Sequence, residues 1–195
     1  QSLNFLIYKP KDIEFIDATS ESGYRCYIRT LDMVMACAVR ELWPDCDLRI
    51  EHPISKGFYC TIRKSREESK KITPEVVQEL KARMQSIIAE NRPVITEERQ
   101  TKEVIRLFGE CKKGETTLFE TLGNPYCRYY RIGDYIDYYT GALMPSTGYI
   151  NLFDVGYVNV RFVKEGVSQW YDGERMNVYK YTNIVFLMFI KEPEP

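Results

Sequence analysis

The chain has 195 residues, of which 44% are hydrophobic and 28% charged, a composition typical of a soluble domain with a buried core. Its formal net charge of −1 provides no overall positive field, so binding to bulk nucleic acid is not favoured. The opening residues lack a signal segment. The longest apolar run, residues 184–190, is far shorter than the roughly 20 residues that span a membrane. We therefore expect a cytoplasmic protein without a membrane partner.

The first part of the chain predicts a hairpin. Asn4–Tyr8 and Asp12–Asp17 have the composition and alternation of strands. Ser20–Gly23 is predicted as a turn, and Tyr24–Ile28 as the strand that follows it.

Three later segments have the apolar spacing of helices: Thr30–Trp43, Thr73–Asn91 and Thr101 to about Cys111. Thr30 is predicted to cap the first. The second is the best defined, because Thr73 is a good N-cap residue and Pro74 suits the first helical position. Thr117–Leu122 is ambiguous, and Gly114 with its polar neighbours is predicted as loop.

The remaining predicted strands alternate with turn residues. They are Leu48–Ile50, Phe58–Arg63, Val94–Glu97, Val158–Phe162, a hairpin of Val167–Tyr171 with Met176–Tyr181, and Asn183–Ile190. Helices and hairpins in mixed order predict an α+β fold, with an antiparallel sheet backed by helices.

The chain's thiols and its imidazole give little support to a metal site. It has six cysteines without a Cys-x-x-Cys pair, and we expect mostly buried free thiols. Because His52 is the one histidine, a zinc site built from imidazoles is nearly excluded. The sequence also lacks a Walker loop, a Gly-x-Gly-x-x-Gly fingerprint and a Gly-x-Ser-x-Gly elbow.

Tyr129–Tyr149 (YYRIGDYIDYYTGALMPSTGY) is the stretch on which the functional interpretation depends. Its tyrosines are either sheet residues that are partly buried, or the lining of a pocket that stacks on a planar ligand. Asp134 and Asp137 would face opposite sides of a strand, so they are poor candidates for a paired acid and base. Both aspartates are also common in turns, where their side chains form hydrogen bonds with the backbone.

Three collinear segments resemble threonyl-tRNA synthetases. Leu42–Ile62 (LWPDCDLRIEHPISKGFYCTI) is similar to the LWP…GFYYD stretch of that family, and Ile72–Ile95 to the long helix after it. Gly133–Pro145 (GDYIDYYTGALMP) is similar to the segment that carries the D-x-C-R-G-P-H motif. The resemblance implies the fold of the second additional domain, the editing domain of threonyl- and alanyl-tRNA synthetases.

The resemblance also implies where the editing site would lie. A His-x-x-x-His pair of the family falls on Arg29 and Met33, and the Cys and His of the later motif fall on Tyr139 and Leu143. None of these four residues can transfer protons near neutral pH or bind a metal as the histidines and the cysteine of the family motif do. Ester hydrolysis by the family's route is therefore not expected here.

A long form of bacterial nucleoside (uridine) kinases gives a better match. Gly133–Tyr149 resembles their GDY-DYY-G…PSTGY motif, and Asp12–Leu31 is also similar. These proteins carry a synthetase-like region ahead of a P-loop kinase domain that uses ATP and Mg²⁺. The resemblance implies that residues 1–11 are the tail of a small β (TGS-like) segment, 12–190 the editing-domain-like module, and 191–195 the start of a linker.

The first hypothesis is therefore a non-catalytic ligand-binding or regulatory module of a uridine kinase. It would contact its own kinase domain and a small nucleoside or amino acid, or it would only pack and assemble the enzyme. No catalytic residue, metal ligand or cofactor is assigned to this chain. The candidate ligand-binding residues are Arg29, His52, Tyr59, Tyr130, Asp134, Tyr138 and Tyr139.

Two alternatives remain. One is an aminoacyl-tRNA editing hydrolase with a rebuilt site that uses His52 or a cysteine. The other is an RNA-binding module, which the interleaved acidic residues do not favour. Its basic patch would consist of Lys64, Arg66, Lys70, Lys71, Arg83, Arg92 and Arg99.

Overall fold

The computed structural model of the chain describes residues 6–12, 14, 16–54, 57–65, 68–109, 113–158, 169–171, 174–176 and 185–189. The chain divides into two compact units. Unit 1 comprises Gln1–Ala38 and Met84–Asn151, and unit 2 comprises Val39–Arg83 and Leu152–Pro195. Helices and small antiparallel sheets occur together, which confirms the mixed α+β class.

Helix α1 (Glu21–Leu42) begins at Glu21 and not at Thr30. Ser20 caps it, because its Oγ accepts a hydrogen bond from the Gly23 amide at 3.1 Å. The predicted strand Tyr24–Ile28 is therefore wrong. No strand includes the described residues of Asp12–Asp17, so the predicted hairpin is wrong as well.

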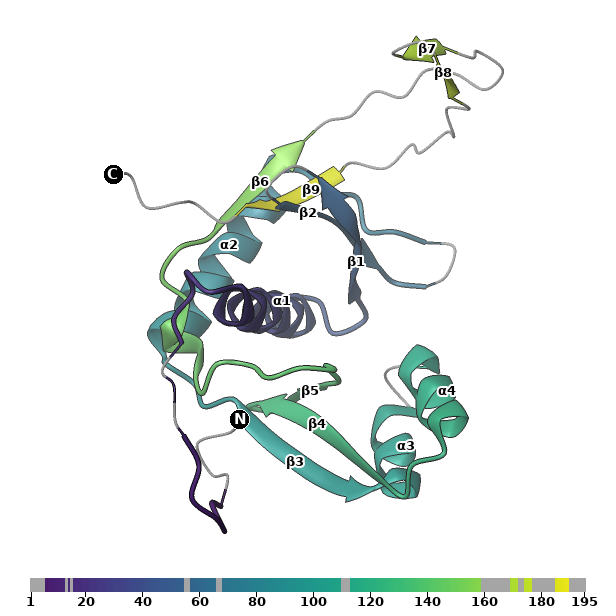
Figure 1. Cartoon of the computed structure of the whole chain (residues 1–195). Helices are drawn as coiled ribbons and strands as arrows, with labels where there is room; N and C mark the ends of the chain where they lie inside the picture. The colour runs from purple at the N-terminus through teal and green to yellow at the C-terminus, as the bar shows by residue number, and fades with distance from the viewer. Residues whose placement is uncertain are drawn as a thin grey trace. The chain divides into compact units, whose positions relative to one another are not determined.

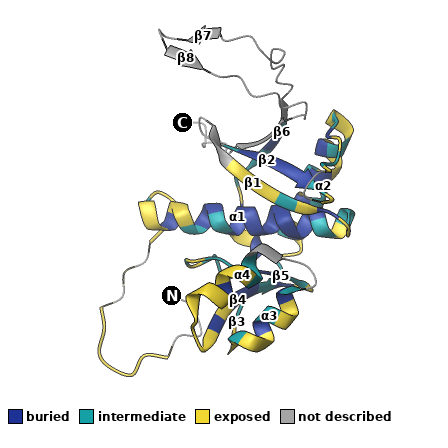
Figure 2. Cartoon of the chain, turned by 90° about the vertical axis from the view of Figure 1, so that its right-hand side faces the viewer, coloured by how far each residue is buried: buried dark blue, intermediate teal, exposed yellow. Residues whose placement is uncertain are grey.

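Gly23 allows a close backbone approach in the first turn of α1. A Cβ atom there would lie 1.8 Å from the carbonyl oxygen of Asp17, so only glycine lets the chain fold back this closely onto the helix. Every residue from Thr30 to Val39 is buried, and Figure 2 shows this run along the middle of α1. A helix that is buried all round does not need a single apolar stripe.

The sheet of unit 1 has the order β3-β4-β5 and is antiparallel. Its strands are β3 (Ile95–Gln100), β4 (Tyr126–Ile132) and β5 (Tyr135–Asp137). Between β3 and β4 the chain forms α3 (Thr101–Gly109) and α4 (Lys113–Leu122), which lie together at one end of the sheet in Figure 1. The predicted loop at Gly114 is wrong, because α4 includes it.

An aromatic cluster joins the two short helices to the sheet. Phe108 and Phe119 meet edge to face, with ring centroids 5.4 Å apart, and Phe108 meets Tyr129 in the same way at 5.8 Å. Phe119 also contacts Tyr138 at 5.1 Å. The Tyr129 hydroxyl donates to Glu97 at 2.5 Å, and burial, followed by Glu97, raises the pKa of Tyr129 to about 12. These contacts fix the α3–α4 pair against β4.

The residues after β5 return to the end of helix α2 (Pro74–Ala89), which Asn91 follows with a φ of 48°. Thr147 is fully buried. Its Oγ1 donates to the Ile87 carbonyl at 2.8 Å and accepts from the Arg92 amide at 2.9 Å. The Pro-Ser-Thr-Gly segment is thus anchored by a buried hydroxyl, and it includes the 3-10 helix η1 (Thr147–Tyr149).

Unit 2 contains a four-stranded antiparallel sheet of order β1-β2-β9-β6. Its strands are β1 (Asp47–Ile54), β2 (Gly57–Arg63), β9 (Val185–Phe189) and β6 (Asp154–Val158). The predicted strands at Leu48–Ile50, Phe58–Arg63 and Asn183–Ile190 are confirmed in the described residues.

The other predictions in unit 2 have mixed outcomes. Thr73 caps α2 as predicted, because its Oγ1 accepts from the Val76 amide at 3.4 Å. β7 (Gln169–Tyr171) and β8 (Glu174–Met176) pair as a hairpin, but β8 begins two residues before the predicted second strand, of which the structure describes only Met176. Of the strand predicted at 158–162, the structure describes only Val158, which ends β6.

The five described cysteines are free thiols, and Cys111 lies outside the described residues. In the part of the chain that the structure describes, no helix is long and apolar enough to cross a membrane.

Candidate functional site

The segment Tyr139–Met144 of unit 1, called the strap from here on, belongs to no strand. Side chains of α1 hold it. Arg29 Nη1 donates to the Ala142 carbonyl at 2.7 Å, and Thr30 Oγ1 accepts from the Met144 amide at 2.8 Å. The strap is therefore fixed by individual side chains, without a backbone ladder on either side.

Tyr130 of β4 supplies a third attachment. Its hydroxyl donates to the Gly141 carbonyl at 2.9 Å, and its ring meets that of Tyr139 with centroids 6.4 Å apart. Gly141 also allows Arg29 to approach, since a Cβ there would lie 2.2 Å from Arg29 Nη1. A side chain at position 141 would therefore push the guanidinium away from the strap.

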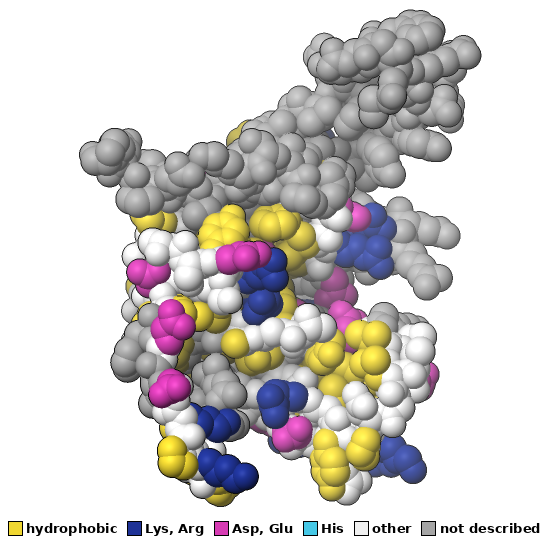
Figure 3. All heavy atoms as spheres, viewed as in Figure 1, with side chains coloured by type: hydrophobic (Ala, Val, Ile, Leu, Met, Phe, Trp, Pro, Cys, Tyr) yellow, Lys and Arg dark blue, Asp and Glu magenta, His cyan; other side chains and the backbone are white. Residues whose placement is uncertain are grey.

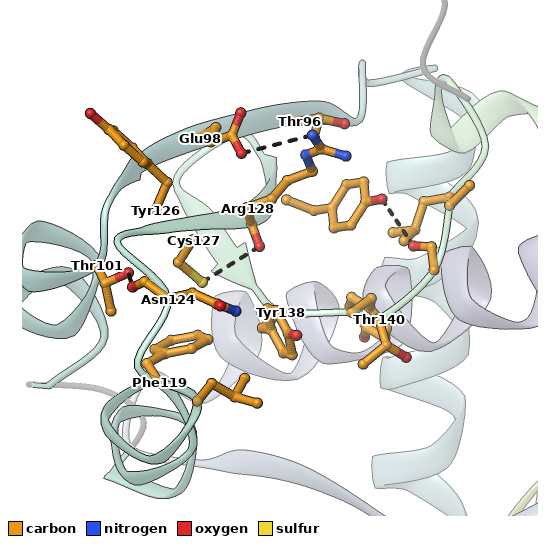
Figure 4. Close-up of a pocket in the computed structure, with 16 residues that line it drawn as sticks. Thr96, Glu98, Thr101, Phe119, Asn124, Tyr126, Cys127, Arg128, Tyr138 and Thr140 are labelled. Atoms are coloured by element: carbon orange, nitrogen blue, oxygen red, sulfur yellow. Dashed lines mark hydrogen bonds and ion pairs between the residues drawn. The ribbon is translucent and has the colours of Figure 1, made fainter.

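A cavity of about 490 Å³ lies between the strap, β3, β4 and α4 (Figure 4). In Figure 4 the Phe119 and Tyr138 side chains lie near each other on one side, and Glu98 and Arg128 lie on the other. Its lining consists of Thr96, Glu98, Thr101, Phe119, Leu122, Asn124, Tyr126, Cys127, Arg128, Tyr130 and the residues from Tyr138 to Leu143.

The sheet register explains why there is space at this position. β5 pairs only with the end of β4, from Tyr130 to Ile132, and β3 pairs with the whole strand. Beyond Asp137 the chain leaves the sheet as the strap, so among the described strands none covers the β5 side of residues 126–129. The cavity lies along this uncovered part of β4.

Asp137 is buried at the junction of β5 and the strap. Its carboxylate accepts from the Tyr135 hydroxyl at 2.7 Å and from the Tyr138 amide at 2.8 Å. Burial, followed by the Asp137 charge, raises the pKa of Tyr135 well above its usual range. Both oxygens have structural partners, and Asp137 thus orients the start of the strap.

Asp32 of α1 is a buried carboxyl group that the sequence interpretation missed. It is 8% exposed, and among the described side chains its Oδ1 is the buried polar atom without a hydrogen-bond partner. Burial raises its pKa to about 7. Burial also raises the pKa of Tyr139 well above its usual range, with further contributions from Asp137 and Asp32. The signal for Asp32 in the sequence was an acid within the apolar run from Leu31 to Ala38.

The structure brings part of the predicted site together. Tyr130, Tyr138 and Tyr139 line the cavity, and Arg29 contacts the strap from α1. Asp134 is exposed in the turn between β4 and β5 and does not line the cavity.

The two other predicted site residues belong to unit 2. Tyr59 is 9% exposed in β2. The side chain of His52 lies outside the described part of β1.

The four positions matched to the synthetase editing motif have different environments. Tyr139 and Leu143 line the cavity, and Arg29 lies against Gly141. Met33 is fully buried in α1. Among the described residues there is no group of three or more His, Cys, Asp or Glu side chains that could hold a metal ion.

The proposed basic patch receives little support. Arg83 pairs with Glu41 at 2.5 Å, and Arg92 with Glu90 at 2.6 Å. Arg99 pairs with Glu97 at 3.0 Å. On the face shown in Figure 3, basic side chains are scattered among acidic, polar and apolar ones. Arg66 lies outside the described residues, and the RNA-binding alternative stays a prediction.

The fold and the cavity define an α+β chain with a strap held across one sheet edge, and the comparisons relate it to one part of a larger enzyme. It is 32% identical over 143 residues to the threonine–tRNA ligase of Syntrophotalea carbinolica, a match that covers 72% of this chain and 22% of that protein. The ligase of Syntrophomonas wolfei is 28% identical over 155 residues, 78% of this chain and 24% of the relative. The ligase of Rubrobacter xylanophilus is 30% identical over 142 residues, a match that covers 73% of this chain and 21% of that protein.

The chain thus spans less than a quarter of the length of these relatives. No family model matches it. The similarity to a segment of threonine–tRNA ligases is confirmed.

Proposed function

We propose that this chain is a non-catalytic ligand-binding module with the fold of a synthetase editing domain, and that it regulates a nucleoside kinase domain of the same protein. One observation carries the proposal. The cavity is bordered by residues at the editing-motif positions, yet Tyr139, Leu143 and the adjacent Arg29 have replaced the residues of that motif. The space remains, and none of these three residues has the proton-transfer or metal-binding chemistry of the residue that it replaces.

The cavity has the size and lining of a small-molecule site. Its volume of about 490 Å³ is within the range of pockets that bury small ligands. Phe119, Tyr138 and Tyr139 offer aromatic surface, and Thr101, Asn124 and the strap backbone offer polar groups. A nucleoside, with its planar base and its hydroxyl groups, suits this combination.

The assignment to a kinase rests on the resemblance of Gly133–Tyr149 to the motif of long-form uridine kinases. ATP and Mg²⁺ would bind the kinase domain, because this chain contains no phosphate-binding loop. A ligand in the cavity would influence that domain through the strap, whose attachments are few enough to rearrange.

Uridine should raise the melting temperature of the chain. A ligand at a hundred times its dissociation constant stabilises a folded protein of this size by roughly 5–10 °C. Thr140→Trp fills the cavity from an exposed position of the strap and should abolish the shift. Tyr149→Trp is the control, because Tyr149 is 56% exposed and does not line the cavity. A uridine shift that survives Thr140→Trp would show that the cavity is not the site.

Asp32 favours the aminoacyl-tRNA hydrolase as a second candidate. Asp32 is a buried carboxyl group whose Oδ1 has no hydrogen-bond partner among the described residues, and burial raises its pKa to about 7, a value that suits a general base. This candidate requires turnover of mischarged tRNA that depends on Asp32.

A further inference from the structure

Arg128 is the basic residue of the cavity lining. It lies two residues before Tyr130 on β4, so both side chains are on the same face of the strand. The register places Glu98 of β3 opposite Arg128. Figure 4 shows these two side chains beside each other at the cavity.

The contact between Arg128 and Glu98 is weak. Arg128 Nη2 is 3.8 Å from Glu98 Oε1, beyond hydrogen-bond distance, and the two side chains are 63% and 55% exposed. An ion pair of this kind contributes little to folding stability. The guanidinium therefore keeps its donors for another acceptor.

A second guanidinium, that of Arg29, contacts the strap residues that line the cavity. Arg29 contacts Gly141 of the strap and uses Nη1 for the Ala142 carbonyl. Burial raises the pKa of Tyr130, and the charges of Arg128 and Arg29 oppose this rise. Arg29 lies against the same Gly141 whose carbonyl accepts from the Tyr130 hydroxyl, whereas the carboxylate oxygens of Asp137 accept from Tyr135 and Tyr138.

We propose that the ligand of this cavity carries an oxyanion, and that Arg128 is the specificity-determining residue that binds it. This inference rests on the proposed function and adds the chemical class of the ligand. The planar fork of a guanidinium binds two oxygens of a phosphate monoester or a carboxylate at once. Glu98 competes for the same guanidinium while the cavity is empty, and the oxyanion displaces it.

Calorimetric titration with uridine, uridine 5′-monophosphate and uridine-5′-carboxylate tests the inference. At least one of the two anions should bind about tenfold more tightly than uridine, and comparing the two separates phosphate from carboxylate recognition. The advantage should decrease with added salt, because the charges lie at an exposed site.

Two variants of the same ion pair should have opposite effects. Arg128→Gln should remove the advantage of the anion over uridine, and Glu98→Gln should strengthen anion binding a fewfold because the competing carboxylate is gone. Arg106→Gln is the control for net charge, since Arg106 is exposed on α3 and does not line the cavity. Urea unfolding of each variant checks that the fold is retained.

The outcomes separate this inference from the proposed function. If uridine binds and neither anion binds more tightly, the oxyanion site is wrong and the proposed function stands. If none of the three probes binds, both are wrong. If Arg128→Gln and Glu98→Gln change anion affinity in the same direction, the pair has a structural role and the assignment of Arg128 is wrong.

Discussion

Replacing Asp32 with asparagine should stabilise the protein at pH 8 and have little effect near pH 4. Asp32 is buried, and its Oδ1 has no hydrogen-bond partner to lose. Burial raises its pKa to about 7, whereas the unfolded chain has the ordinary value of 3.8. Asparagine has the shape of the protonated acid and does not ionise.

The direction of the pH effect follows from this difference in pKa. Between the two values the folded protein holds a proton that the unfolded chain has released. The free energy of unfolding is therefore highest below pH 4, where both states are protonated, and it decreases as the pH rises towards 7. Above pH 7 the loss of free energy of unfolding caused by the buried charge is constant. For a pKa shift of this size the loss is roughly 4 kcal/mol.

Urea unfolding of the wild type and Asp32→Asn from pH 4 to pH 8.5 measures this difference. Asp134→Asn is the matched control, because Asp134 is exposed and its replacement should change the free energy of unfolding little. An Asp32→Asn variant that loses stability equally at every pH would show that the carboxylate has a stabilising partner in the folded protein.

Replacing Thr30 with valine should detach the strap from α1. Thr30 is fully buried, and its Oγ1 donates to the Cys26 carbonyl at 2.8 Å while it accepts from the Met144 amide at 2.8 Å. Valine has nearly the same shape but leaves the Met144 amide without its acceptor. The free energy of unfolding should fall by about 2 kcal/mol.

Thr121→Val of α4 is a close control for this variant. Thr121 Oγ1 makes the same kind of bond, to the Thr117 carbonyl at 2.8 Å, but the residue is exposed and holds no strap. Its replacement should change the free energy of unfolding by less than about 0.5 kcal/mol. Hydrogen exchange should show faster exchange of the strap amides in Thr30→Val only. Equal effects of both variants would contradict the role of Thr30.

Much of the fold follows from local signals in the sequence. Thr73 and Pro74 mark the start of α2 because capping depends on neighbouring residues. The alternation in Phe58–Arg63 predicts β2, since one face of an antiparallel strand is buried. Local patterns of this kind need no knowledge of the rest of the chain.

The errors arise where two local signals compete or where a distant contact decides the structure. Tyr24 and Ile28 have strand propensity, but Ser20 caps a helix there and Gly23 lets Asp17 approach it. In the same way, α4 is fixed by the packing of Phe119 against Phe108, which no local pattern shows.

Some residues of the candidate site could be predicted from the sequence, and others could not. The tyrosines could be chosen from the sequence as pocket residues, and three of them line the cavity. Arg128 could not be chosen, because its environment comes from the strand register. Asp32 had a signal in the sequence, an acid within an apolar run, but only the burial of α1 on all sides shows its importance.

Deacylation of mischarged seryl- and threonyl-tRNA tests the loss of hydrolysis most directly. The account predicts that the chain releases amino acid no faster than buffer at any pH between 6 and 8.5, and that Asp32→Asn and His52→Ala change nothing. Turnover by the wild type that either variant abolishes would contradict the account and establish the chain as a hydrolase.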